Sequence, residues 1–107
     1  VNCGHVIVSG DVTATNFNST SDARLKIDIQ EIDGISLVHK IRPLAFKWQT
    51  GEQSYGVLAQ ELREVFPSLV AEDKDGYLSV NYTPLIAMLV DAVQKLSADV
   101  ELLKSQI

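Results

Sequence analysis

The chain has 107 residues, of which 46% are hydrophobic and 21% charged, and its formal net charge is −5. This length and composition predict one domain with a modest core, which association with other chains would enlarge. The negative charge excludes a protein that binds the nucleic-acid backbone, because phosphate contacts need clustered Lys and Arg. No apolar run approaches the length of a membrane span, so we expect no membrane partner.

Residues 1–20 alternate apolar and polar side chains around a turn signal at Ser9-Gly10-Asp11. Alternation with period two predicts short β-strands rather than a helix. An isolated hairpin of this size would be only marginally stable.

A hydroxyl and an amine lie five residues apart at Ser21 and Lys26. Such a pair can act as nucleophile and base if burial lowers the pKa of the lysine from about 10.4 toward neutrality. Leu25 and Ile27 flank Lys26, so we expect partial burial. Neither a regular helix nor a straight strand would bring the two side chains together, and the segment must therefore bend. The alternative is a helix N-cap with a solvated lysine.

The next stretch predicts a short helix followed by a hairpin. The helix is expected over Asp33–Ile41 and is stopped by Pro43, which restricts the residue before it. Strands are expected at Leu44–Trp48 and Tyr55–Leu58, joined by a loop. Their cross-strand aromatic contacts should contribute much of the core, with Phe46 and Trp48 against Tyr55 or Val57.

A second helix is predicted over Ala59–Val65, where apolar and polar side chains separate onto two sides. Pro67 follows and ends it. Asp75-Gly76 is a strong turn signal, which predicts a second hairpin between Leu69–Ala71 and Tyr77–Tyr82.

The last predicted element is a helix over residues 84–107, with Thr83 as its N-cap and Pro84 as its first helical residue. Its apolar residues follow a heptad repeat, with Ile86, Val93, Val100 and Ile107 at position a and Leu89, Leu96 and Leu103 at position d. This pattern predicts a coiled coil between copies of the chain, and β-branched residues at a with Leu at d are typical of two parallel strands. The alternative is one amphipathic helix packed on its own domain.

The elements together predict an α+β fold: a small domain of short β-hairpins and short helices that ends in a coiled-coil helix. Five pieces of the sequence support a resemblance to a known family. They are Ser21-Asp22-Ala23-Arg24-Leu25-Lys26 with Ile29, Arg42-Pro43 with Phe46 and Trp48, Tyr55-Gly56-Val57-Leu58-Ala59-Gln60-Glu61 with Val65-Phe66-Pro67, Tyr77-Leu78-Ser79-Val80-Asn81-Tyr82, and Leu85-Ile86. On these pieces, in this order, the chain resembles the peptidase S74 family, the intramolecular chaperone domain of phage endosialidases, tail spikes and tail fibres.

The resemblance implies that residues 1–20 are the C-terminal end of a fibre or spike client and residues 21–107 its chaperone, assembled as a parallel homotrimer. It implies that Ser21 attacks a neighbouring peptide carbonyl with Lys26 as general base, cutting Thr20–Ser21 or Ser21–Asp22 in a single turnover. No metal or other cofactor is expected. The implied partners are other copies of the chain and the client segment, which belongs to the virion tail and is assembled in the host cytoplasm.

Six further polar residues are candidates for supporting roles: Asp22, Arg24, Gln60, Glu61, Asn81 and Tyr82. The first two would act on Lys26 in opposite senses, because a like charge disfavours its protonated form and an opposite charge favours it. The other four would position the scissile segment or donate to an oxyanion. Their alternative roles are helix capping, hairpin pairing and interface hydrogen bonds.

Two other functions remain open beside a self-cleaving chaperone. One is a trimerisation cap that does not cleave, against which the presence of both Ser21 and Lys26 argues. The other is a self-processing domain of a cellular, membrane-anchored transcription factor. The alternating pattern of residues 6–14, followed by Asn16-Phe17-Asn18, is more typical of a fibre.

Overall fold

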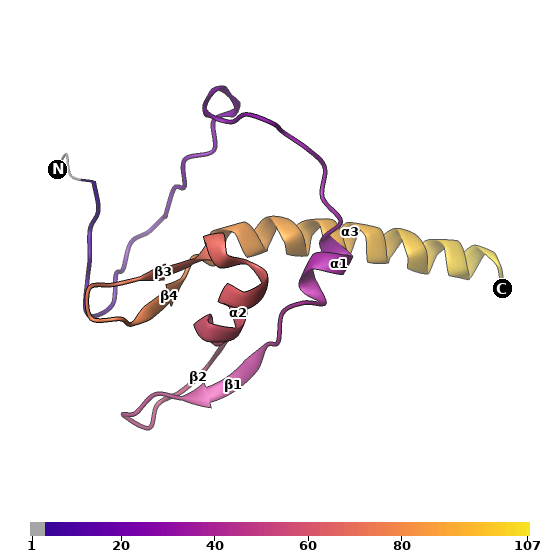
Figure 1. Cartoon of the computed structure of the whole chain (residues 1–107). Helices are drawn as coiled ribbons and strands as arrows, with labels where there is room; N and C mark the ends of the chain where they lie inside the picture. The colour runs from indigo at the N-terminus through magenta and orange to yellow at the C-terminus, as the bar shows by residue number, and fades with distance from the viewer. Residues whose placement is uncertain (1–3) are drawn as a thin grey trace. The chain divides into compact units, whose positions relative to one another are not determined.

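The computed structural model describes residues 4–107 (Figure 1). The chain divides into two units, Val1–Gln30 and Glu31–Ile107. The second unit combines short hairpins with helices, which confirms the predicted α+β class. Its elements are α1 (Gly34–Val38), β1 (Leu44–Lys47), β2 (Gln53–Gly56), α2 (Ala59–Val65), the 3₁₀ helix η2 (Pro67–Leu69), β3 (Val70–Glu72), β4 (Leu78–Val80) and α3 (Thr83–Ser105).

In the first unit, residues 4–20 contain neither helix nor strand, and the prediction of short strands there is wrong. All side chains of this stretch are exposed, including Ile7 at 93%. Alternation favours a strand only where one face can be buried, and a lone hairpin gains too little from pairing with itself. The regular element among residues 4–30 is the 3₁₀ helix η1 (Ala23–Leu25).

In the first hairpin β1 lies within the predicted Leu44–Trp48, but β2 starts two residues before the predicted Tyr55–Leu58, and the side-chain pairing differs. Phe46 lies opposite Ser54, and Tyr55 lies opposite Ala45 on the other face of the hairpin. Phe46 therefore contacts Trp48 rather than Tyr55, with ring centroids 5.0 Å apart in an edge-to-face arrangement. The register is set by a tight turn in which the Gly51 N–H donates to the Trp48 carbonyl at 2.8 Å.

The helix α2 spans the predicted residues, and the second hairpin, β3 with β4, turns at Asp75-Gly76 as predicted. Gly76 has a φ of +84°, a conformation that glycine adopts at little cost. The Asp73 carboxylate also accepts the N–H groups of Asp75 and Tyr77, each at 2.9 Å. Local turn chemistry thus fixes this hairpin.

Helix α1 is shorter than the predicted Asp33–Ile41, and α3 starts differently from the prediction. Tyr82 is the N-cap of α3 and Thr83 is already helical. The amide oxygen of Asn81 accepts the Thr83 N–H at 3.3 Å, so a residue further upstream takes over the capping. The prediction of Thr83 as N-cap is therefore wrong.

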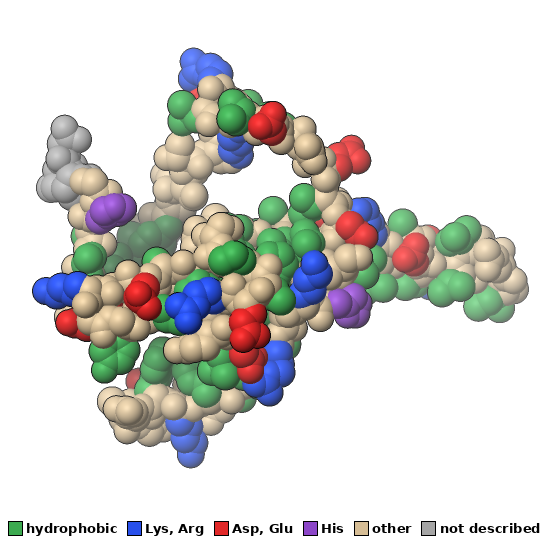
Figure 2. All heavy atoms as spheres, viewed as in Figure 1, with side chains coloured by type: hydrophobic (Ala, Val, Ile, Leu, Met, Phe, Trp, Pro, Cys, Tyr) green, Lys and Arg blue, Asp and Glu red, His purple; other side chains and the backbone are tan. Residues whose placement is uncertain are grey.

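The core is small and lies between α2, the second hairpin and the first turns of α3. Leu62, Leu69 and Leu85 are buried, and six half-buried residues pack around them: Ile41, Val57, Phe66, Val70, Val80 and Met88. Most other large apolar side chains are exposed. Figure 2 shows apolar atoms at the surface of the C-terminal half of α3. The domain thus leaves extensive apolar surface for association.

Candidate functional site

The candidate site is the bend at residues 21–26. Asp22 caps η1, since its Oδ1 accepts the Arg24 N–H at 2.9 Å. The Leu25 N–H donates to the Asp22 carbonyl at 3.0 Å and the Lys26 N–H to the Ala23 carbonyl at 3.1 Å. This single tight turn bends the chain, as contact between side chains five residues apart requires.

The turn brings the two side chains into contact. Lys26 Nζ donates a hydrogen bond to Ser21 Oγ at 2.7 Å. That distance is within the range over which a general base takes a proton from a nucleophile. We call Ser21 and Lys26 the dyad.

The surroundings of the dyad differ from the expectation of partial burial. Ser21 and Lys26 are both exposed, and their apolar neighbours Leu25 and Ile27 are 73% and 87% exposed. Within residues 4–30 no element covers them, so adjacent apolar residues do not bury the lysine. Any shielding of the dyad from water must come from outside this segment.

The two charged residues between the members of the dyad pair with each other. Arg24 Nη2 donates to Asp22 Oδ2 at 2.8 Å, and Arg24 Nε donates to Asp22 Oδ1 at 3.1 Å. The hydrogen bonds from Arg24 lower the pKa of the Asp22 carboxyl. The opposite charges of Asp22 and Arg24 are thus directed at one another.

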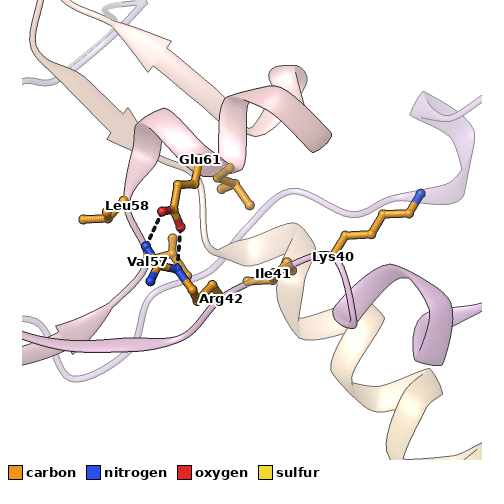
Figure 3. Close-up of a pocket in the computed structure, with 7 residues that line it drawn as sticks. Lys40, Ile41, Arg42, Val57, Leu58 and Glu61 are labelled. Carbon is orange, nitrogen blue, oxygen red and sulfur yellow. Dashed lines mark hydrogen bonds and ion pairs between the residues drawn. The ribbon is translucent and has the colours of Figure 1, made fainter.

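The other four candidates belong to the second unit. Glu61 accepts hydrogen bonds from Nε and Nη2 of Arg42 in a two-pronged ion pair, with Nε at 3.0 Å (Figure 3). This pair lowers the pKa of the Glu61 carboxyl and lies at a small pocket of about 40 Å³, lined also by Ile41 and Val57. Arg42 was missed as a partner because nineteen residues separate it from Glu61 in the sequence.

Asn81 and Tyr82 make contacts that hold the fold. The Asn81 N–H donates to the Leu69 carbonyl at 2.8 Å, while its side chain caps α3. The Tyr82 hydroxyl accepts the Val57 N–H at 3.5 Å. Gln60 is exposed beside an open groove that Phe46 and Trp48 also line. Asn81 thus makes the capping and hairpin contacts of the alternative reading, whereas Glu61 pairs with Arg42 and Tyr82 with the Val57 N–H.

The heptad positions of α3 are uncovered in the single chain. The a and d residues from Ile86 to Leu103 are between 40% and 63% exposed. Helix α3 packs on its own domain through other residues, Leu85 and Ala92, which are buried. Ile107, the last predicted a position, follows the end of the helix. We call the exposed a and d residues the seam.

Residues 4–107 contain no cluster of His, Cys, Asp and Glu side chains able to hold a metal ion. Among the helices of this same range, none combines the length and apolar character needed to cross a bilayer.

Comparison with known proteins gives two findings. A model of the family described as chaperone of endosialidase, peptidase S74, matches residues 21–71. The chain is also 32% identical over 108 residues to the long tail fiber protein Gp37 of Enterobacteria phage K3, and equally to that of Enterobacteria phage T2. These alignments cover 91% of this chain but 9% and 8% of the two fibre proteins, so the chain spans less than a tenth of their length.

Proposed function

We propose that this chain belongs to the chaperone-of-endosialidase family, whose model matches residues 21–71, and that it is an intramolecular chaperone that cuts itself from a phage tail fibre. The observation that carries this proposal is the 2.7 Å hydrogen bond between Lys26 Nζ and Ser21 Oγ inside the matched segment. The similarity to tail fiber proteins favours a fibre of the virion tail as client, assembled in the host cytoplasm, over a cellular transcription factor.

The proposed reaction is an acyl transfer to Ser21. Ser21 Oγ attacks the carbonyl carbon of the scissile peptide while its proton passes to the neutral amine of Lys26. The C–N bond then breaks, and Lys26 returns the proton to the leaving amine. Water hydrolyses the resulting ester and restores the hydroxyl. Because substrate and catalyst are parts of one chain, effective molarity supplies most of the acceleration and one turnover is enough.

Both peptide bonds beside Ser21 are candidates for cleavage. Attack on the Thr20 carbonyl closes a five-membered ring through the backbone nitrogen of Ser21, whereas attack on the carbonyl of Ser21 itself closes a strained four-membered ring. Ring strain therefore favours the bond Thr20–Ser21. This cut would separate residues 1–20, the proposed end of the client, from residues 21–107, the proposed chaperone.

We infer that the active form is a parallel homotrimer. The exposed seam of α3 supports association, because burying its six large apolar side chains between chains would lower the free energy. The a and d residues alone favour two strands. However, Val38, Ile41 and Pro43 line one apolar groove together with Ile86 and Leu89 of the seam. In an assembly, residues outside α3 would therefore contact neighbouring chains as well. The heptad pattern of α3 alone then does not set the number of chains.

Assembly would also supply what the dyad lacks. A lysine acts as a base only as the neutral amine, which removal from water favours. In the single chain Ser21 and Lys26 are in contact but exposed to water, so the geometry of the dyad is present and its burial is not. Coverage by neighbouring chains would provide the missing burial.

The test is the intact mass of four purified chains: wild type, Ser21→Ala, Lys26→Ala and Lys26→Arg. We expect two fragments from the wild type, whose masses locate the cut, and one uncut species from each variant. Arginine fails because a guanidinium does not release its proton at any accessible pH. Processing of Lys26→Ala at the wild-type rate would show that the dyad is wrongly assigned.

A trimerisation cap that does not cleave is the second candidate, and the exposure of Lys26 favours it. The same measurement separates the two functions. A wild-type chain that is trimeric by light scattering and stays uncut would support the cap.

A further inference from the structure

Two side chains on neighbouring turns of α3 hold the backbone at the start of the second unit. Asp91 Oδ2 accepts the Gly34 N–H at 2.6 Å. Lys95 Nζ donates to the Ile32 carbonyl at 2.8 Å and pairs with Asp91 Oδ2 at 3.0 Å. One ion pair thus binds both an N–H and a carbonyl on either side of Asp33. We call this arrangement the anchor.

The backbone of α1 lies close against the backbone of α3 beside the anchor. A Cβ on Gly34 would lie 2.3 Å from the Met88 carbonyl oxygen and 2.7 Å from the Ala92 nitrogen, both backbone atoms of α3. Only glycine allows this approach, and Gly34 is buried. The anchor is therefore a specific contact and not a chance meeting of exposed charges.

The anchor lies a short way along the chain from the dyad. Five residues, 27–31, separate Lys26 from Ile32, and we call them the tether. Six peptide steps reach at most about 20 Å when fully extended. Asp28 has a left-handed φ of +52°, so the tether is bent and its reach is shorter. Fixing Ile32 on α3 therefore restricts the volume that the dyad can explore.

The anchor also shares its helical turns with the seam. Asp91 and Lys95 alternate along α3 with Leu89, Val93 and Leu96, which are exposed seam residues. When α3 helices associate, the seam fixes the helices and the anchor fixes the origin of each tether on them. Without the anchor, the first fixed point after the dyad would lie further downstream than Ile32. The longer free segment would lower the effective concentration of the dyad near its site of reaction.

We propose that Asp91 and Lys95 are positioning residues for self-cleavage. They fix the chain directly after the tether to α3 and so limit where the dyad can lie. This inference rests on the proposed function. An isolated Lys–Asp pair four residues apart on a helix would add only a few tenths of a kcal/mol to stability. In the anchor the two side chains also bind the backbone at Ile32 and Gly34, just beyond the tether, so their loss should reduce the rate of cleavage more than it reduces the stability of the helix.

The test follows cut fraction against time by intact mass, with light scattering on the same samples. Asp91→Ala removes the acceptor for Gly34, and Lys95→Met removes the donor to Ile32. We expect both variants to trimerise and to be cut about tenfold to a hundredfold more slowly than wild type, as for a misplaced reacting group. The matched control is Glu101→Gln with Lys104→Met, which removes an exposed pair from the same helix and should leave the rate unchanged.

Two further variants separate positioning from helix stability. The reversal Asp91→Lys with Lys95→Asp keeps the net charge and a pair on the helix but offers Gly34 no acceptor at position 91, so it should be slow. Lys95→Arg keeps a donor to Ile32 and should restore most of the rate.

Wild-type rates in trimeric Asp91→Ala and Lys95→Met would overturn the positioning role while leaving the dyad in place. Slow cutting that is explained by loss of the trimer would overturn it as well, because the pair would then act through assembly. A wild-type chain that is never cut would instead overturn the proposed function, and the positioning role with it.

Discussion

Lys26 Nζ and Ser21 Oγ are 2.7 Å apart in a segment where both side chains are exposed. In this hydrogen bond the amine donates to the hydroxyl oxygen. Catalysis needs the reverse, with the serine hydroxyl donating to a neutral amine. The single chain therefore has the contact distance of a dyad, with the hydrogen bond drawn in the direction opposite to the proposed proton transfer.

The rate of self-cleavage should rise with pH, because the neutral fraction of Lys26 increases as protons are removed. The measurement is the cut fraction at fixed times between about pH 6 and pH 9, a range chosen to lie below the titration of an ordinary lysine. Light scattering at each pH controls for loss of the trimer. A rate that stays flat while the trimer persists would contradict a lysine base.

Acid should destabilise the fold through the ion pair of Arg42 and Glu61. Hydrogen bonds from Arg42 lower the pKa of Glu61 in the folded chain. A lowered pKa adds stability above the unfolded value, about 4.3 for Glu, and that stability is lost as pH falls toward the folded value. In a Ser21→Ala background, thermal unfolding should show Glu61→Gln less stable than its parent at neutral pH and equal to it in acid. Parallel pH profiles for the two proteins would contradict this role of the pair.

Gly34→Ala should weaken the packing of α1 on α3. The new Cβ would meet backbone atoms at 2.3 and 2.7 Å, and backbone cannot move aside as a flexible side chain can. We expect a loss of about 1–3 kcal/mol, typical of overpacking, in denaturant unfolding. Gly10→Ala is the matched control, since a Cβ there meets nothing within 4 Å. Equal stability of the two variants would show that α1 can shift without cost.

The sequence predicted elements whose signals are local. The helix over Ala59–Val65 follows from its apolar face and from Pro67, and the turn at Asp75-Gly76 follows from the left-handed conformation that Gly76 adopts. The bend between Ser21 and Lys26 could be deduced from their spacing and from the expected contact of their side chains. All of these depend on residues within a few positions of one another.

The predictions failed where the structure depends on residues far apart in the sequence. Alternation in residues 4–20 could not form strands without a surface to bury one face. The anchor could not be read from the sequence, because Gly34 and Asp91 are 57 residues apart. Apolar neighbours in the sequence do not predict burial of Lys26, because a side chain is buried only by elements packed against it.

The last prediction links assembly to cleavage. Leu96→Asp and Leu103→Asp each place a carboxylate in the seam, which costs several kcal/mol if the charge is buried in the assembled coil. Neither residue belongs to the dyad, and both are exposed in the single chain, so the fold of the monomer should persist. We expect both variants to be monomeric by light scattering and uncut by intact mass. Ala98→Asp, on the opposite side of the same helix, should remain trimeric and be cut normally. Efficient cleavage by a monomeric Leu96→Asp chain would show that the dyad needs no neighbours, and that the coiled coil serves assembly alone.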